Sequence, residues 1–362
     1  MLVWRLVALG ITSIILLSAC GNPTTDMAQS EDARFRLIGV YETAAVVLDR
    51  ESGALRFYSP DGDRMWTDES SLEDRLVDFL STGNLGVSSE PQSSPDSAAG
   101  SEPALVRTPD GDVVKLEDQG TGLTRVLAEQ PDGSFVTLVT SSDGTKARVS
   151  GLPKSGRQPV LDVAADSLDW LPSPSATAGL IYNYSPAVPA AIWVLKQAAQ
   201  SKTWSYEKKI VVEQGMRFGC ISDDGSLLVH LGEEGATVEN VATGESRMSS
   251  TELGRVSGCH AASTSYVLIE RRMSAGGART QYEWIDATSG EVRKRESIPA
   301  EAMISLSPEG DTLIVSYAGS VITSNKSGEA HEYPGLDGRI VRPGYLHVLN
   351  MLGSISVVET KS

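Results

Sequence analysis

The chain has 362 residues, of which 40% are hydrophobic, and it contains 34 glycines and 17 prolines. A chain of this length can bury a large core without metal or disulfide support, and its many turn-forming residues favour short strands over long helices. The formal charge of −16 repels phosphate backbones. It therefore argues against nucleic-acid binding and against docking on anionic lipid through a basic patch.

The first 19 residues have the pattern of a secretory signal peptide. Arg5 provides a short positive start, and Leu6–Leu17 is an apolar run too short for a comfortable membrane span. The ending Leu17-Ser18-Ala19-Cys20 resembles a bacterial lipobox, which implies cleavage before Cys20 and attachment of a diacylglycerol to its sulfur. The alternatives are an uncleaved anchor helix and an ordinary signal with a chance cysteine.

Residues 20–34 are small and polar, which is typical of a flexible tether between a lipid anchor and a domain. We therefore expect a lipoprotein held at the extracytoplasmic face of the cell membrane through lipid at Cys20.

From Phe35 onwards, period-two strand patterns recur to the end of the chain. A strand–turn–strand phrase with an Asp/Glu-Gly turn appears at 221–231 and 306–316, with a looser copy at 129–139. The glycine in each turn supplies the positive φ that closes a hairpin. A second, Gly-Glu turn follows at Gly244, Gly290 and Gly328.

The first kind of turn has a regular period. Turns at Gly133, Gly179, Gly225, Ser265 and Gly310 are 46, 46, 40 and 45 residues apart. This period, with four short strands in each interval, resembles the WD40-like and quinoprotein-like β-propeller repeats. No repeat carries the terminal Trp-Asp pair or the Gly-His of true WD40 repeats, so the resemblance is to an architecture.

The resemblance implies an all-β fold, a β-propeller of four-stranded blades over residues 35–359. The 324 residues from Phe35 to Val358, divided by a period of about 44, favour seven blades, with six and eight left open. Because residues 339–358 supply only three strands, we expect a strand at 35–40 to complete the last blade and close the ring. An array of β-sandwiches is the alternative fold.

Residues 68–103 interrupt the repeats. Ser70 and Glu73 have the spacing of a capping box, and Leu72, Leu76 and Leu80 have helical spacing. Residues 81–103 are rich in Ser, Pro and Gly, a composition typical of a loose loop. We interpret 68–103 as a helical and disordered insertion in one blade, with a domain boundary as the alternative.

Cys220 and Cys259 remain as an even pair if Cys20 carries lipid. Each follows a glycine and precedes its turn by five residues, so in a propeller both would lie on innermost strands of adjacent blades. Neighbouring strands are close enough for a disulfide in an oxidising compartment, and we predict one here. Two buried free thiols are the alternative.

The sequence contains little that points to catalysis. It has four histidines, no Gly-x-Ser-x-Gly elbow, no zinc-type spacing and no complete calcium-binding loop, so we expect no cofactor or metal and assign no catalytic residue. One aromatic segment with prolines suggests a possible binding surface for a peptide or sugar, with ordinary strand packing as the alternative. Its residues are Trp170, Tyr182, Tyr184, Trp193 and Trp204.

We therefore favour a monomeric, membrane-anchored propeller that acts as a binding or assembly module for a protein partner. The alternative is an extracytoplasmic propeller enzyme, a hydrolase, lyase or quinoprotein-like oxidoreductase that uses the mouth of the central channel.

Overall fold

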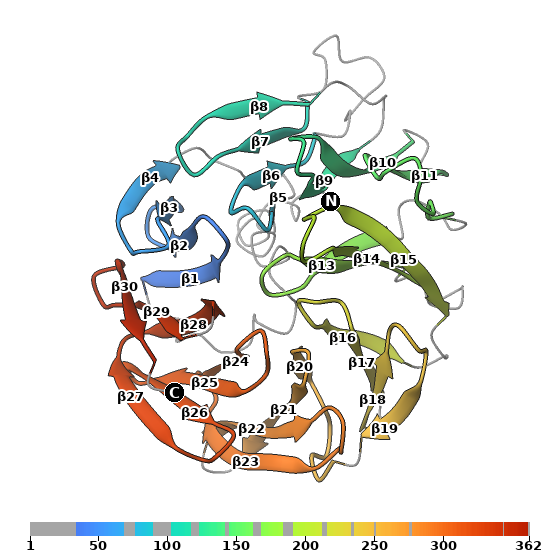
Figure 1. Cartoon of the computed structure of the whole chain (residues 1–362). Helices are drawn as coiled ribbons and strands as arrows, with labels where there is room; N and C mark the ends of the chain where they lie inside the picture. Colours follow the sequence, from blue (N-terminus) through green and yellow to red (C-terminus); the bar gives the residue numbers. More distant parts are fainter. Residues whose placement is uncertain are drawn as a thin grey trace, which may run out of the picture.

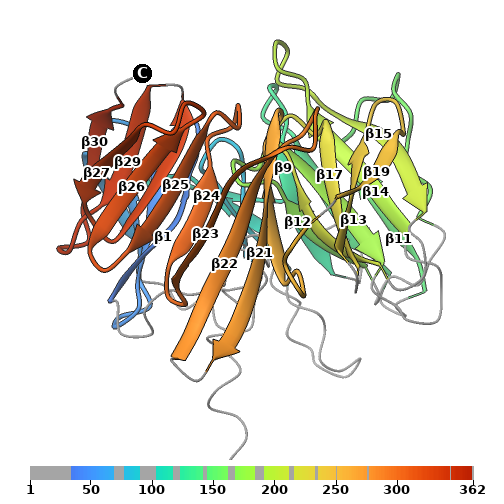
Figure 2. The same ribbon diagram turned by 90° about the horizontal axis from the view of Figure 1, so that it is seen from below.

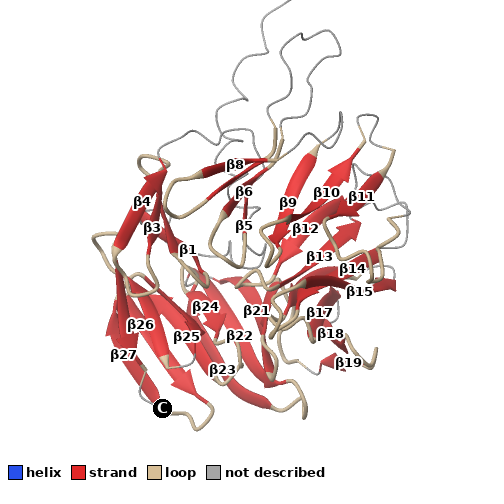
Figure 3. Cartoon of the chain, turned by 45° about the horizontal axis from the view of Figure 1, so that its top comes forward, coloured by secondary structure: helices blue, strands red, loops and turns tan. Residues whose placement is uncertain are grey.

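The computed structural model describes residues 34–68, 77–89, 103–116, 123–141, 145–161, 168–183, 191–211, 216–232, 235–249, 251–274, 277–342 and 344–360. Within these ranges every helix or strand element is a strand (Figure 3). In the same part of the chain, no helix is long and apolar enough to cross a membrane.

The described strands form eight antiparallel sheets, each a blade of a propeller, arranged around a central axis (Figure 1). Blade 1 contains β1 (Phe35–Val40), β2 (Ala45–Asp49), β3 (Leu55–Tyr58) and β4 (Arg64–Asp68). Blade 2 contains β5 (Val77–Phe79), β6 (Leu85–Val87), β7 (Leu105–Arg107) and β8 (Val113–Lys115). Blade 3 contains β9 (Thr124–Glu129), β10 (Phe135–Thr140) and β11 (Ala147–Ser150). Blade 4 contains β12 (Leu168–Pro172), β13 (Ala178–Asn183), β14 (Ala191–Gln197) and β15 (Trp204–Val211).

The remaining four blades follow in chain order. Blade 5 contains β16 (Arg217–Ile221), β17 (Leu227–Gly232), β18 (Gly235–Asn240) and β19 (Ser246–Ser249). Blade 6 contains β20 (Gly258–Ala261), β21 (Ser265–Ser274), β22 (Gly277–Asp286) and β23 (Val292–Pro299). Blade 7 contains β24 (Met303–Leu306), β25 (Thr312–Tyr317), β26 (Ser320–Asn325) and β27 (Ala330–Pro334). Blade 8 contains β28 (Asp337–Arg342), β29 (Tyr345–Leu349) and β30 (Ile355–Glu359).

The all-β propeller is therefore confirmed, with eight blades at the upper end of the expected range. The additional blade is blade 2, which occupies the segment interpreted above as an insertion. Its strands are only three residues long, and the phrase with the Asp/Glu-Gly turn is missing from its first hairpin. For this reason the repeat spacing underestimated the number of blades.

The helix expected near residues 70–80 is wrong where the structure describes that segment, because Val77–Phe79 is strand β5. Val77 and Phe79 are buried against Val46 and Phe57 of blade 1. The sheet pairing and this packing override the helical spacing of the leucines. The capping-box residues Ser70 and Glu73 lie outside the described residues.

The predicted closure by strand 35–40 is also wrong. This strand, β1, pairs with β2 and is the innermost strand of blade 1, and no described strand adds to β30 of blade 8. Side chains join the two blades instead. Phe35 and Leu37 pack with Leu349, and the Tyr58 hydroxyl donates a hydrogen bond to the Gly353 carbonyl at 2.6 Å.

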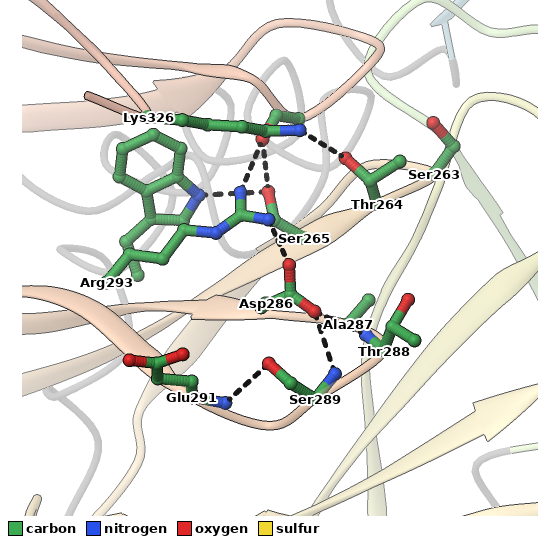
Figure 4. A network of polar contacts seen from close by, with 12 residues as sticks. Ser263, Thr264, Ser265, Asp286, Ala287, Thr288, Ser289, Glu291, Arg293 and Lys326 are labelled. Carbon is green, nitrogen blue, oxygen red and sulfur yellow. Dashed lines mark hydrogen bonds and ion pairs between the residues drawn. The ribbon is translucent and has the colours of Figure 1, made fainter.

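The turns explain how consecutive blades interlock. Gly225 and Gly310 have φ of +66° and +73°, so the predicted hairpin turns are present. Figure 4 shows the contact between blades 6 and 7, where the Ser265 hydroxyl donates to the Gly310 carbonyl at 2.7 Å and accepts from Trp284 Nε1 at 2.9 Å. Arg293 also donates to that carbonyl and forms an ion pair with Asp286.

Candidate binding site at the channel mouth

The topology gives the disc two different faces. In each blade the first strand in chain order is the innermost (Figure 1). The turns from first to second strand open on one face, which we call the mouth face. The turns from second to third strand lie on the other face, which we call the tether face because β1 begins there. The long β21–β22 hairpin extends beyond the other described strands on the tether face (Figure 2).

A cavity of about 920 Å³ opens on the mouth face. This volume is in the range of pockets that hold small molecules or peptide side chains. Its charged lining residues are mixed in sign: Glu42, Asp223, Asp224 and Glu309 are acidic, and Lys196, Lys202 and Arg342 are basic. The mouth is therefore not simply an extension of the overall negative charge.

The turn after β14 lies over part of this mouth. Lys202 Nζ lies 3.4 Å from Glu42 Oε2 of blade 1, and Gln197 Nε2 donates to Ser81 Oγ of blade 2 at 3.4 Å. Both ends of the Lys202–Glu42 pair are about half exposed. Exposed pairs of this kind contribute little to stability, so the contact can be exchanged for a ligand at low cost.

A smaller cavity of about 60 Å³ lies in the channel beneath the mouth. It shares Val40, Tyr41, Ser175 and Asp223 with the mouth cavity, so the channel narrows inward from one into the other. We call it the inner cavity.

Three polar side chains from consecutive inner strands line the inner cavity. They are His260 on β20, Ser305 on β24 and Arg339 on β28. Burial, with a smaller effect from the positive charge of Arg339, lowers the pKa of His260 to about 3. The imidazole is therefore neutral at physiological pH and offers one donor and one acceptor.

Two buried carboxylates accompany these groups: Asp223 lines the inner cavity, and Asp337 lies 3.5 Å from Arg339 Nη1. Burial raises the pKa of both carboxyl groups. The hydrogen bond from the Ser175 N–H acts to lower the pKa of Asp223, and the charges of Arg339 and Arg36 act to lower that of Asp337, but burial has the larger effect. The Ser175 N–H donates to Asp223 Oδ1 at 2.8 Å, which fixes this carboxylate where the two cavities meet.

The aromatic residues predicted as a binding surface lie elsewhere. Trp170, Trp193 and Trp204 are at most 2% exposed and form one core cluster with blade 3, so the prediction of a surface is wrong for them. The reason is that neighbouring blades cover both faces of a blade; the first five residues of β14 are all buried. Tyr182 is half-buried against Phe218, and Tyr184 lies outside the described residues.

The predicted disulfide is confirmed. Cys220 on β16 and Cys259 on β20 are bonded, with Cα atoms 5.9 Å apart, and it links adjacent innermost strands. Cys20 lies outside the described residues, so its lipidation stays a prediction.

The inner cavity was not predicted from the sequence, because His260, Ser305 and Arg339 belong to no recognised motif. One signal was present, because His260 and Ser305 are 45 residues apart, which is one repeat period (305 − 260 = 45). Among the described residues, no group of three or more His, Cys, Asp or Glu side chains is placed to hold a metal ion.

Comparison with known proteins shows the fold and no family. No family model matches the chain, and no curated protein matches its sequence. Solved structures that it resembles include BamB from Moraxella catarrhalis, with 14% identity over 91% of this chain and 95% of that one, at a TM-score of 0.47. The WD40 domain of SCAP from fission yeast has 10% identity over 91% and 95%, at a TM-score of 0.49.

A prolyl endopeptidase structure matches at a TM-score of 0.50, with 10% identity over 95% of this chain and 55% of that chain. This chain thus corresponds to little more than half of that protein. At these identities the similarity concerns the propeller architecture alone.

Proposed function

We propose that this protein is a lipid-anchored, extracytoplasmic β-propeller that binds a protein partner at its mouth face. The observation that carries the proposal is the cavity of about 920 Å³ on that face, opposite the face where β1 begins. A rigid ring of blades with a concave centre presents turns from many blades to one ligand.

The tether face has features suited to a membrane surface. The turn between β29 and β30 packs on Phe35, next to the start of β1, and its residues Met351 and Leu352 are 68% and 82% exposed. Exposed apolar side chains beside a lipid anchor favour contact with the bilayer interface. With the tether face toward the membrane, the mouth face points away from it and is open to partners.

The test is photo-crosslinking in living cells. A benzophenone amino acid replaces Lys202 or Glu309 at the mouth. Val114 on the outer strand β8 is the matched control, since it is 45% exposed and does not line the mouth cavity. We expect a discrete protein adduct from both mouth positions and none from Val114. Adducts of equal yield from all three positions would overturn the proposed site.

The same cells test the anchor. Cys20→Ala should abolish incorporation of labelled palmitate and remove the protein from the membrane fraction, because the thioether to lipid cannot form. Unchanged labelling would contradict the lipidation of Cys20.

A further inference from the structure

The inner cavity collects hydrogen-bonding groups that are not used within the described protein. Ser305 is 6% exposed and its hydroxyl has no partner among the described residues. His260 is 3% exposed and lines the same cavity. Leaving a buried hydroxyl without a partner is unfavourable, so Ser305 indicates that a polar group completes it in the cavity that His260 also lines.

Arg339 adds the charge. Its Nη1 contacts Asp337 Oδ1 at 3.5 Å and the Gly338 carbonyl at 3.4 Å, while Nε and Nη2 have no partner within the described ranges. The Nε–Nη2 edge of a guanidinium matches the two oxygens of a carboxylate. Arg36 also lowers the pKa of Asp337 through its charge, so Arg339 is not the only cation that acts on this carboxylate.

We propose that the inner cavity is a carboxylate-binding site, with Arg339 as the ion-pair partner and His260 and Ser305 as hydrogen-bond partners. This deepens the proposed function, since the ligand reaches the site through the mouth. The cavity of about 60 Å³ holds several water molecules, which is room for one carboxylate group and not for a large ligand. Asp223 at the junction with the mouth limits the site to a single negative charge.

The carboxylate has two possible sources. It belongs to an acidic residue or C-terminus of a partner that enters through the mouth, or to a free small carboxylic acid. The chemistry of recognition is the same in both cases, so the experiment separates them by the probe that binds.

The experiment measures binding to the purified full-length protein in detergent by isothermal titration calorimetry. The probes are acetate, an uncharged peptide with a free C-terminal carboxylate, and the same peptide amidated. Saturable binding of acetate alone assigns a free acid, and binding of the carboxylate peptide but not its amide assigns a partner. Failure of both acetate and the carboxylate peptide to bind would overturn the site.

Variants identify the residues. Arg339→Gln should lower the affinity for the probe that binds at least about tenfold. Ser305→Ala should lower this affinity about threefold, and it should fold normally because it removes a hydroxyl without a described partner. Arg64→Gln is the matched control, because Arg64 is exposed on the outer strand β4 and lines neither cavity. Affinities unchanged in both Arg339→Gln and Ser305→Ala would contradict the assignment.

This outcome is independent of the crosslinking test. Purified protein that binds acetate while the mouth yields no adduct in cells would retain the carboxylate site and reject the protein partner. Adducts at the mouth with no binding of acetate or peptide would retain the protein partner and reject the carboxylate site.

Discussion

Three glycines in turns between first and second strands, Gly83, Gly225 and Gly310, lie close to the preceding blade. At Gly310 the backbone has φ of +73°, and an added Cβ would lie 2.5 Å from Ser265 Oγ and 3.0 Å from Ala262 Cβ. Ser265 cannot move away freely, because its hydroxyl bridges the Gly310 carbonyl and the Trp284 indole. A glycine at this position serves both the turn and the close approach of blades 6 and 7.

We predict that Gly310→Ala lowers the free energy of unfolding by about 2–3 kcal/mol, the sum of positive-φ strain and overpacking. Gly328→Ala is the matched control, since Gly328 has φ of +85° and no atom within 4 Å of the added Cβ. It should cost about 1 kcal/mol. Equal losses in urea unfolding would show that the contact with blade 6 does not matter.

The ion pair in the same contact titrates in acid. Burial acts to raise the pKa of Asp286, but the Ser289 N–H, Arg293 and the Thr288 N–H together lower it to about 2. The stabilisation is present above the ordinary carboxyl pKa and is lost as the pH falls toward 2, so this contact between blades stays intact near neutrality.

At the level of elements, a covalent bond between two inner strands links adjacent blades. The disulfide joins β16 to β20 across the boundary of blades 5 and 6, where Cys220 and Cys259 belong to one buried cluster with Val229 and Leu268. The two cysteines that it joins are 39 positions apart in the sequence. The bond therefore constrains the unfolded chain over almost one repeat.

We predict that the Cys220→Ser/Cys259→Ser double variant loses about 3–4 kcal/mol of unfolding free energy, the chain-entropy value for a loop of this length. Denaturant unfolding with and without dithiothreitol measures it. Reductant should destabilise the unmodified protein and leave the double variant unchanged. A reductant effect of the same size on both would exclude the disulfide as its cause.

At the level of the whole molecule, the ring closes without a shared strand in the described residues. Blade 8 meets blade 1 through apolar side chains and through His347, whose Nε2 lies 2.9 Å from the Pro60 carbonyl. Burial lowers the pKa of His347, and the hydrogen bond with the Pro60 carbonyl opposes this effect more weakly. The pKa of His260 in the channel is lowered to about 3. Both imidazoles are neutral in the folded protein at neutral pH.

Stability should therefore fall with acidification from pH 7 to pH 5. Below about 6.5 the unfolded chain binds more protons at these histidines than the folded protein does, which gives a slope of at most about 1.4 kcal/mol per pH unit for each. His347→Gln should reduce the difference in unfolding free energy between pH 7 and pH 5, measured with guanidinium. An unchanged difference in His347→Gln would contradict the prediction.

Local chemistry made several features predictable from sequence. Asp/Glu-Gly turns, the alternation of strands and a period near 45 residues indicated a propeller, because each blade is one sheet of consecutive strands repeated along the chain. The same register placed Cys220 and Cys259 on neighbouring inner strands. These features depend on residues close in sequence or separated by one repeat.

Only the tertiary structure decided the remaining features. The three-residue strands of blade 2 are too short for a periodic signal and exist because blades 1 and 3 pack on both sides of them. Trp193 is core rather than surface because a blade is covered on both faces. The meeting of His260, Ser305 and Arg339 arises only when three inner strands surround one channel, and no local pattern encodes which strands become neighbours.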